Sequence, residues 1–127
     1  MSTLNELNEL LGQTLAYVYG EIGDDQMELI TKDGRIYLFY HEQDCCESVA
    51  IEDIIGDLSD LIGEPLTEAE EVTDRESIPE NDTHHLMDES FTWTFYKFRT
   101  RKGSVTIRWL GESNGYYSEE VNFKRVK

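Results

Sequence analysis

Three apolar segments between residues 14 and 41 are separated by polar and glycine-containing turns, and this pattern is typical of strands. Residues 14–20 are rich in β-branched and aromatic side chains and predict one strand. Residues 26–31 and 35–41 predict a hairpin, because the Asp33-Gly34 dipeptide between them suits the positive φ angles of its turn. The run Ile36–Tyr40 is apolar on both faces, so we expect this strand to be central and covered on both sides.

Apolar residues at helical spacing mark two further segments. Leucines at positions 4, 7, 10 and 11 form one stripe that ends at Gly12, and they predict a short N-terminal helix. Residues 48–52 predict a short strand. From Ile51, apolar residues fall at 51, 54, 55, 58, 61 and 62, which predicts a helix of about three turns that ends at Gly63.

The last third of the chain has the strongest β pattern. Residues 67–73 predict a strand, whereas residues 74–89 lack an apolar period and predict a flexible acidic loop. Aromatic residues at 91, 93 and 95 alternate with polar ones, and residues 105–109 and 117–123 follow after turns. We therefore expect a three-stranded meander with an aromatic inner face.

These elements predict an α+β domain. We expect a single twisted antiparallel sheet of about six or seven strands, with one or two short helices packed on it, and one domain over residues 1–127. The longest apolar runs have five residues, whereas a spanning helix needs about 20, so no membrane segment is expected. Residues 1–12 contain two Glu and neither Lys nor Arg, unlike a secretory signal, which predicts a cytoplasmic protein.

The net charge of −16 is unevenly distributed along the chain. Residues 1–40 carry −5, residues 41–90 carry −16, and residues 91–127 carry +5. This charge argues against direct binding to nucleic acid or to an anionic membrane. A fold that leaves the acids of residues 41–90 outside gives a negative face that attracts basic proteins. A fold that sets them against the C-terminal strands neutralises them, and a third interpretation is that they keep the protein soluble.

A basic cluster near one predicted hairpin tip could pair with the acids of residues 41–90. Its members are Lys97, Arg99, Arg101 and Lys102, close to two aromatic residues. Basic residues interleaved with aromatic ones can bind single-stranded nucleic acid. In a chain of this charge, pairing with the acidic residues or protection of a sheet edge is the favoured role.

The segment of seven residues from 41 to 47 contains five candidate ligand-binding side chains: His41, Asp44, Cys45, Cys46 and Glu47. Imidazole and thiolate groups are good ligands for soft metals. Adjacent cysteines on extended backbone point to opposite sides, and a disulfide between them is strained and unexpected in a reducing cell. The alternatives are a small-ligand or metal site, a reactive thiol, or a structural turn in which one cysteine is a small buried hydrophobe.

The sequence contains no motif that identifies an enzyme. Residues 111–115 match the nucleophile-elbow pattern, but both flanks are predicted strands and every His lies upstream of Ser113. Phosphate-binding loops, dinucleotide fingerprints and metalloprotease motifs are absent from the sequence. We therefore expect a protein that is not an enzyme and that needs no cofactor or metal.

Three strings in the chain are specific enough to compare with a family: H-x-x-D-C-C-E, I-x-G-D-x-x-D-L-I-G and W-x-G-E-S-N-G-Y-Y-S-E. With them, most of residues 10–123 resembles an uncharacterised family of small acidic proteins found mostly in bacteriophage genomes. The resemblance implies a phage or prophage accessory protein inside a bacterial cell. It implies no activity, cofactor or catalytic residue.

The charge and the resemblance lead to one expected function. We expect a non-enzymatic protein that binds and modulates a host protein with a basic surface, through a negative surface that mimics nucleic acid. The residues expected to form this surface are Glu52, Asp53, Asp57, Asp60, Glu64, Glu68, Glu70 and Glu71. The alternative is a small-ligand or metal-binding domain centred on the segment 41–47, with the Ser113–Tyr117 turn nearby.

Overall fold

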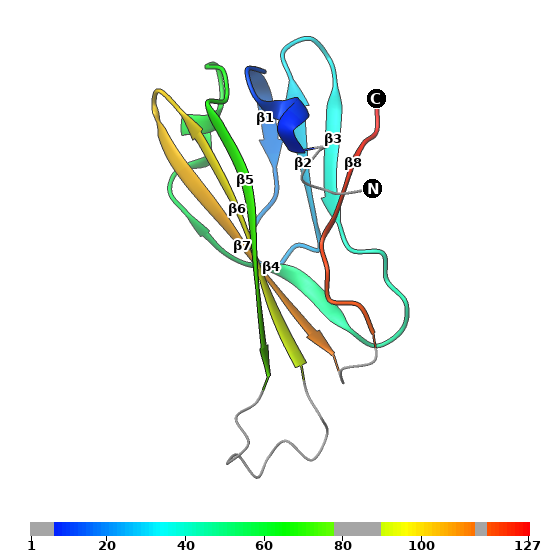
Figure 1. Ribbon diagram of the computed structural model, residues 1–127. Coiled ribbons are helices and arrows are strands. Elements are labelled where there is room, and N and C mark those ends of the chain that lie inside the picture. The colour runs from blue at the N-terminus through cyan, green and yellow to red at the C-terminus, as the bar shows by residue number, and fades with distance from the viewer. Residues whose placement is uncertain (1–6, 78–89, 114–116) are drawn as a thin grey trace.

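The computed structural model of the protein describes residues 7–77, 90–113 and 117–127, and it is a sandwich of two four-stranded sheets (Figure 1). The strands of the first sheet lie in the order β1-β2-β3-β8, and those of the second in the order β4-β7-β6-β5. Every strand pair is antiparallel. The strands are β1 (Leu15–Tyr19), β2 (Gln26–Thr31), β3 (Ile36–Tyr40), β4 (Ser48–Ile55), β5 (Glu68–Ser77), β6 (Ser90–Thr100), β7 (Gly103–Ser113) and β8 (Asn122–Arg125).

The two sheets bury their inner faces against each other. Phe39 of β3 packs against Tyr96 and Phe98 of β6, with ring centroids 4.5 Å and 6.0 Å apart. Ile107 and Trp109 of β7 are fully buried in the same core. Two sheets packed face to face, with side chains interdigitating between them, define a β-sandwich.

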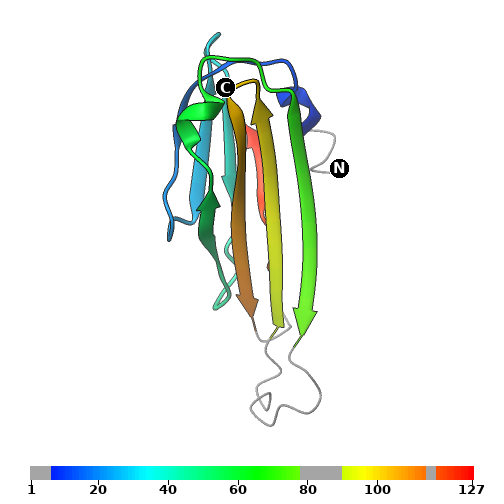
Figure 2. The same ribbon diagram turned by 90° about the vertical axis from the view of Figure 1, so that its left-hand side faces the viewer.

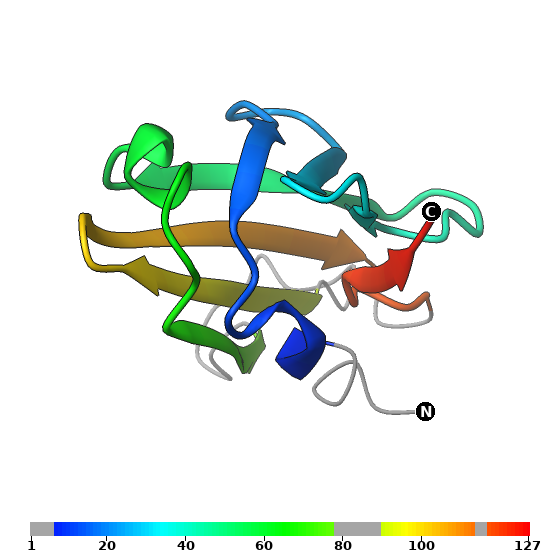
Figure 3. The same ribbon diagram turned by 90° about the horizontal axis from the view of Figure 1, so that it is seen from above.

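The expected α+β class with a single sheet is therefore wrong. Helical structure in the described residues is limited to two short 3₁₀ turns, η1 (Asn8–Leu10) and η2 (Leu58–Leu61). Both lie at the end of the sandwich that faces the viewer in Figure 3. Of the N-terminal helix expected from the leucine stripe, η1 is the part that falls within the described residues.

A β-bulge explains why the helix expected from Ile51 onward is wrong. Val49 and Ile51 are buried in β4, and the register then shifts between Ile51 and Asp53. One extra residue in the strand turns an i, i+2 spacing into i, i+3, so that Ile54 packs against the core in a pattern that imitates a helix. Gly56, with a φ of 111°, follows the end of the strand, and only the single turn of η2 comes after it.

The inner face of β6 is the opposite of the one expected. Thr92 and Thr94 are buried, whereas Phe91, Trp93 and Phe95 are only partly buried on the outer face. Tyr96 and Phe98, the residues that contact Phe39 of the other sheet, point inward and so bring every even-numbered residue of the strand inside.

The hairpin expected around Asp33-Gly34 is confirmed. Strand β2 pairs with β3, and Gly34 adopts a φ of 94° in the turn between them. The expectation that β3 is covered on both sides is wrong. Tyr37 and Phe39 are buried, but the alternate residues of β3 are only partly buried on the outer face of the sheet.

The C-terminal strand leaves the expected meander and joins the other sheet. Strand β8 pairs with β3, not with β7. On its way the chain passes close to β7, because a Cβ atom at Gly111 would lie 2.5 Å from the backbone oxygen of Glu119. The acidic loop expected at 74–89 begins later than expected, since β5 continues to Ser77, and its residues 78–89 lie outside the described residues.

Candidate functional site

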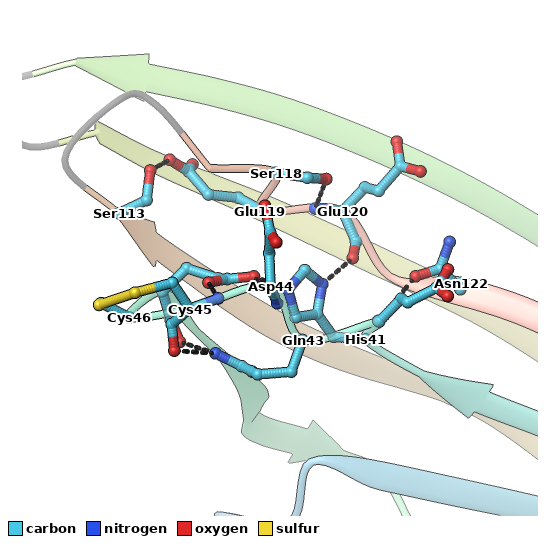
Figure 4. Close-up of polar contacts among 12 residues, drawn as sticks. His41, Gln43, Asp44, Cys45, Cys46, Ser113, Ser118, Glu119, Glu120 and Asn122 are labelled. Carbon is cyan, nitrogen blue, oxygen red and sulfur yellow. Dashed lines mark hydrogen bonds and ion pairs between the residues drawn. A yellow bond between two sulfur atoms is a disulfide. The ribbon is translucent and has the colours of Figure 1, made fainter.

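A buried hydrogen bond between His41 and Glu47 holds the segment between β3 and β4. The Nε2 atom of His41 lies 2.7 Å from Oε2 of Glu47, and the two side chains are 2% and 0% exposed. The Nδ1 atom of His41 lies 2.7 Å from the backbone oxygen of Glu120, just before β8 (Figure 4). Both ring nitrogens are therefore within hydrogen-bond distance of an oxygen atom, one from the side chain of Glu47 and one from the backbone of Glu120.

Glu47 also shapes the turn that precedes it. Its carboxylate accepts hydrogen bonds from the backbone N–H groups of Asp44, at 2.8 Å, and Cys45, at 2.9 Å. Burial raises the pKa of the Glu47 carboxyl, but the hydrogen bonds from His41 and from these backbone groups outweigh it and lower the pKa to about 2. The carboxylate is thus ionised at neutral pH and ties the turn to the end of β3.

The structure joins Cys45 and Cys46 in a disulfide, with both residues exposed. The expectation that neighbouring cysteines stay unpaired is wrong, and so is the expectation that one of them is a buried hydrophobe. The backbone here is not extended, because Glu47 binds two successive N–H groups and bends the chain. Figure 4 shows the sulfur atoms pointing away from His41, so they lie apart from the buried pair.

The polar side chains of His41 and Glu47 are hydrogen-bonded to other groups of the protein. Both ring nitrogens of His41 and both carboxylate oxygens of Glu47 are already in hydrogen bonds. Within residues 7–77, 90–113 and 117–127, no group of three or more His, Cys, Asp or Glu side chains is placed so that it could hold a metal ion. A shallow polar hollow of about 410 Å³ lies at this corner, lined by His41, Glu42, Gln43, Asp44, Ser118, Glu120 and Asn122.

Sequence reasoning missed a second buried carboxylate at the same corner. Glu119 is 3% exposed and accepts hydrogen bonds from the hydroxyls of Thr92, at 2.7 Å, and Ser113. Ser113, the start of the turn that was expected near the segment 41–47, does lie at this corner in Figure 4. The signal for Glu119 was its spacing of two and four residues from Val121 and Phe123, which are both buried.

Three arginines, on β6, on β7 and in the turn between them, pair with residues of the expected acidic surface. Arg108 lies 2.5 Å from Glu52 and 3.6 Å from Asp53. Arg101 lies 3.6 Å from Glu64, and Arg99 lies 3.7 Å from Glu68. The division of charge along the sequence therefore does not persist in space, and pairing of the basic cluster with the acidic residues is confirmed for Arg99 and Arg101.

The other four residues of that surface have different surroundings. Asp57 caps η2 by accepting hydrogen bonds from the N–H and hydroxyl of Ser59, which lower the pKa of its carboxyl. Asp60 is partly buried near the β6–β7 turn, where its backbone oxygen accepts a hydrogen bond from Thr100. The hydroxyl of Tyr96 donates to Glu71 at 2.7 Å, and Glu70 is exposed on β5, opposite Lys97 in the register.

A family model described as Domain of unknown function (DUF7448) matches residues 8–123. The chain belongs to the DUF7448 family. Neither a curated protein nor a solved structure matches it. The expectation of an uncharacterised family is thus confirmed for DUF7448, and no site residue is transferred from another protein.

Strand β5 of this DUF7448 domain, an edge strand that η1 contacts, is the candidate for binding. It forms one end of the second sheet and pairs only with β6 among the described strands (Figure 2). Its ten residues make it one of the longer strands, and Glu68, Glu70 and Asp74 lie on its outer face, where they oppose the outward-facing residues of β6. Among the described residues, no helix has the length and apolar character to cross a membrane.

Proposed function

We propose that this protein is a non-enzymatic binding protein that takes up an extended basic segment of a partner protein along the edge of β5. The observation that carries this proposal is a ten-residue strand with no neighbour on one side among the described strands, together with its acidic side chains. An extended segment can add to such an edge through backbone hydrogen bonds, while its side chains contact those of the edge strand.

The side chains of β5 favour a basic partner. Glu70 and Asp74 have no ion-pair partner within 4.0 Å in the described parts of the chain, and Glu68 keeps 41% of its side chain exposed beside Arg99. Lysine or arginine at alternate positions of an added strand would lie opposite these carboxylates. Opposite charges in such cross-strand pairs each contribute about 0.2–1 kcal/mol.

The same acids oppose self-association at this edge. Two antiparallel β5 strands from two copies of the chain would bring like charges into register, and like charges directly opposite are destabilising. An acidic edge is therefore closed to a second copy and open to a basic strand. This selectivity supports a binding function for the edge beyond protection against aggregation.

We also propose the type of cell and the compartment in which the protein acts. An uncharacterised family, the net charge of −16 and the phage-like strings in the sequence support a phage or prophage accessory protein in the bacterial cytoplasm. Host proteins that hold nucleic acid carry basic segments of the required kind. Arginines of β7 and of the β6–β7 turn pair with Glu52, Asp53 and Glu64. We therefore favour binding of a basic segment along the acidic edge of β5 over a continuous surface that mimics nucleic acid.

Synthetic peptides test the proposal. A peptide of about ten residues that alternates Val and Lys should bind, and its Val/Glu counterpart should not, as measured by fluorescence anisotropy. Replacing Glu68 and Glu70 with Gln and Asp74 with Asn should weaken binding about tenfold, or about 1.4 kcal/mol. A control variant replaces Glu21 and Glu42 with Gln and Asp25 with Asn, three exposed acids outside β5, and should bind as the wild type does.

Hydrogen exchange locates the bound peptide. Backbone amides of β5 that lack a strand partner should become protected when the Val/Lys peptide is added, and those of β1 should not. Equal weakening by both triple variants would show a nonspecific effect of net charge and contradict the proposal. Binding without protection of β5 would also contradict it.

A further inference from the structure

The outer face of the first sheet carries an apolar row that no described element covers. Tyr17, Ile30 and Ile36 lie opposite one another on β1, β2 and β3. Tyr17 is 55% exposed, and both isoleucines are only partly buried. Val126, which donates its N–H to Ile36 and is 55% exposed, lies beside the row. The outer face of a sandwich sheet is usually polar, so an apolar row there marks a contact surface.

The neighbouring row on the same face places opposite charges on either side of an apolar residue. Glu28 of β2 lies opposite Leu38 of β3, and Lys124 of β8 lies opposite Leu38 from the other side. Glu28 has no ion-pair partner within the described residues, and Lys124 is exposed, with its Nζ 4.7 Å from the ring centroid of Tyr40. Stacked Tyr17 and Tyr19 border both rows on β1.

This arrangement is complementary to itself. A two-fold axis parallel to β3, lying above Leu38, would exchange the positions of β2 and β8. Glu28 of one copy would then face Lys124 of the other, and the second Lys124 would face the second Glu28. The same axis would bring Ile36, which lies on β3, against its counterpart, and Ile30 of β2 against Val126, which lies beside Ile36 on the β8 side. We infer that the outer face of this sheet is the interface of a symmetric homodimer.

The distribution of charge favours a second copy of this chain as the occupant. Strands β1, β2, β3 and β8 together contain one acid and two bases, although the whole chain carries −16. Repulsion between like charges therefore opposes dimerisation least on this sheet. The acidic edge of β5 belongs to the other sheet, so the dimer leaves it free for a partner and is independent of the proposed function.

Charge reversal tests the interface by sedimentation equilibrium. The wild type should be dimeric at about 50 μM, and either Glu28→Lys or Lys124→Glu should raise the dimer dissociation constant at least about tenfold, because symmetry creates two like-charge contacts. The double variant restores both contacts and should return the constant to within about threefold of the wild-type value. Glu112→Lys and Lys97→Glu, exposed positions on the other sheet, are the matched controls and should leave the constant unchanged.

Three outcomes would overturn the inference. A wild-type protein that stays monomeric at about 200 μM shows that the face does not bind a second copy. A dimer that neither single reversal weakens lies on another surface. Weakening by the single reversals without rescue in the double variant excludes the two-fold arrangement. Far-ultraviolet circular dichroism of each variant confirms that the chain is folded, and Val126→Ser, on an exposed side chain that the axis places opposite Ile30 of the second copy, provides a second variant that should weaken the dimer.

Discussion

Gly111 of β7 lies directly against Glu119, in the segment that leads to β8. A Cβ atom there would lie 2.5 Å from the backbone oxygen of Glu119 and 2.7 Å from its Cβ. The first distance is about 0.9 Å short of the 3.4 Å at which ordinary van der Waals contact begins. Gly111→Ala therefore has to displace the backbone of β7 or of the segment that holds Glu119, and with it the hydrogen bonds of Thr92 and Ser113.

The expected cost follows from the nature of the contact. Overpacking typically costs about 1–3 kcal/mol, and we expect about 3 kcal/mol because backbone atoms cannot rotate away. An unfolding entropy of about 2.1 cal/mol/K per residue gives about 0.27 kcal/mol/K for 127 residues, so the Tm should fall by about 11 °C. Differential scanning calorimetry measures both quantities.

Gly103→Ala is the matched control. Its Cβ would lie 2.7 Å from Oδ2 of Asp60, the end of a flexible side chain that can rotate away, and its φ is not in the left-handed region. The Tm should fall by less than about 3 °C. If Gly111→Ala costs no more than Gly103→Ala, the close approach of Glu119 to β7 does not constrain the fold as argued.

Three further predictions concern the same corner of the sandwich. Because hydrogen bonds lower the pKa of Glu47 from 4.5 to about 2, its ionised form contributes stability fully above about pH 4.5, and this contribution is lost as the pH falls towards 2. Urea unfolding of the wild type and Glu47→Gln should therefore differ at pH 7 and converge near pH 2; a constant difference would contradict this. Thr92→Val removes the hydroxyl that donates to Glu119 and should cost about 1–3 kcal/mol in thermal unfolding, whereas an unchanged Tm would refute the role of this bond. Mass spectrometry after alkylation should find Cys45 and Cys46 unmodified without reductant and both modified with it, and two modified thiols in the unreduced protein would exclude the disulfide.

The sequence alone determined which segments are extended wherever alternation and turn residues agree. The Asp33-Gly34 hairpin formed as expected, because the glycine supplies the positive φ that the turn needs. It also located the polar cluster at His41–Glu47, since those residue types stand close in the chain. The roles within that cluster depended on the backbone of Glu120, which is distant in sequence.

Tertiary packing decided which face of each strand is buried and which sheet each strand joins. Alternation in β6 fits either face, and contact of Tyr96 and Phe98 with Phe39 selected the even-numbered residues. The pairing of β4 with β7 contains a bulge. This bulge gives the apolar residues of β4 a spacing that resembles that of a helix. The acids that seemed to form one block are divided by arginines from β6, β7 and the turn between them. Local spacing indicates the conformation of a segment where the strand is regular, whereas bulges and strand partners follow from contacts between residues that are far apart in the chain.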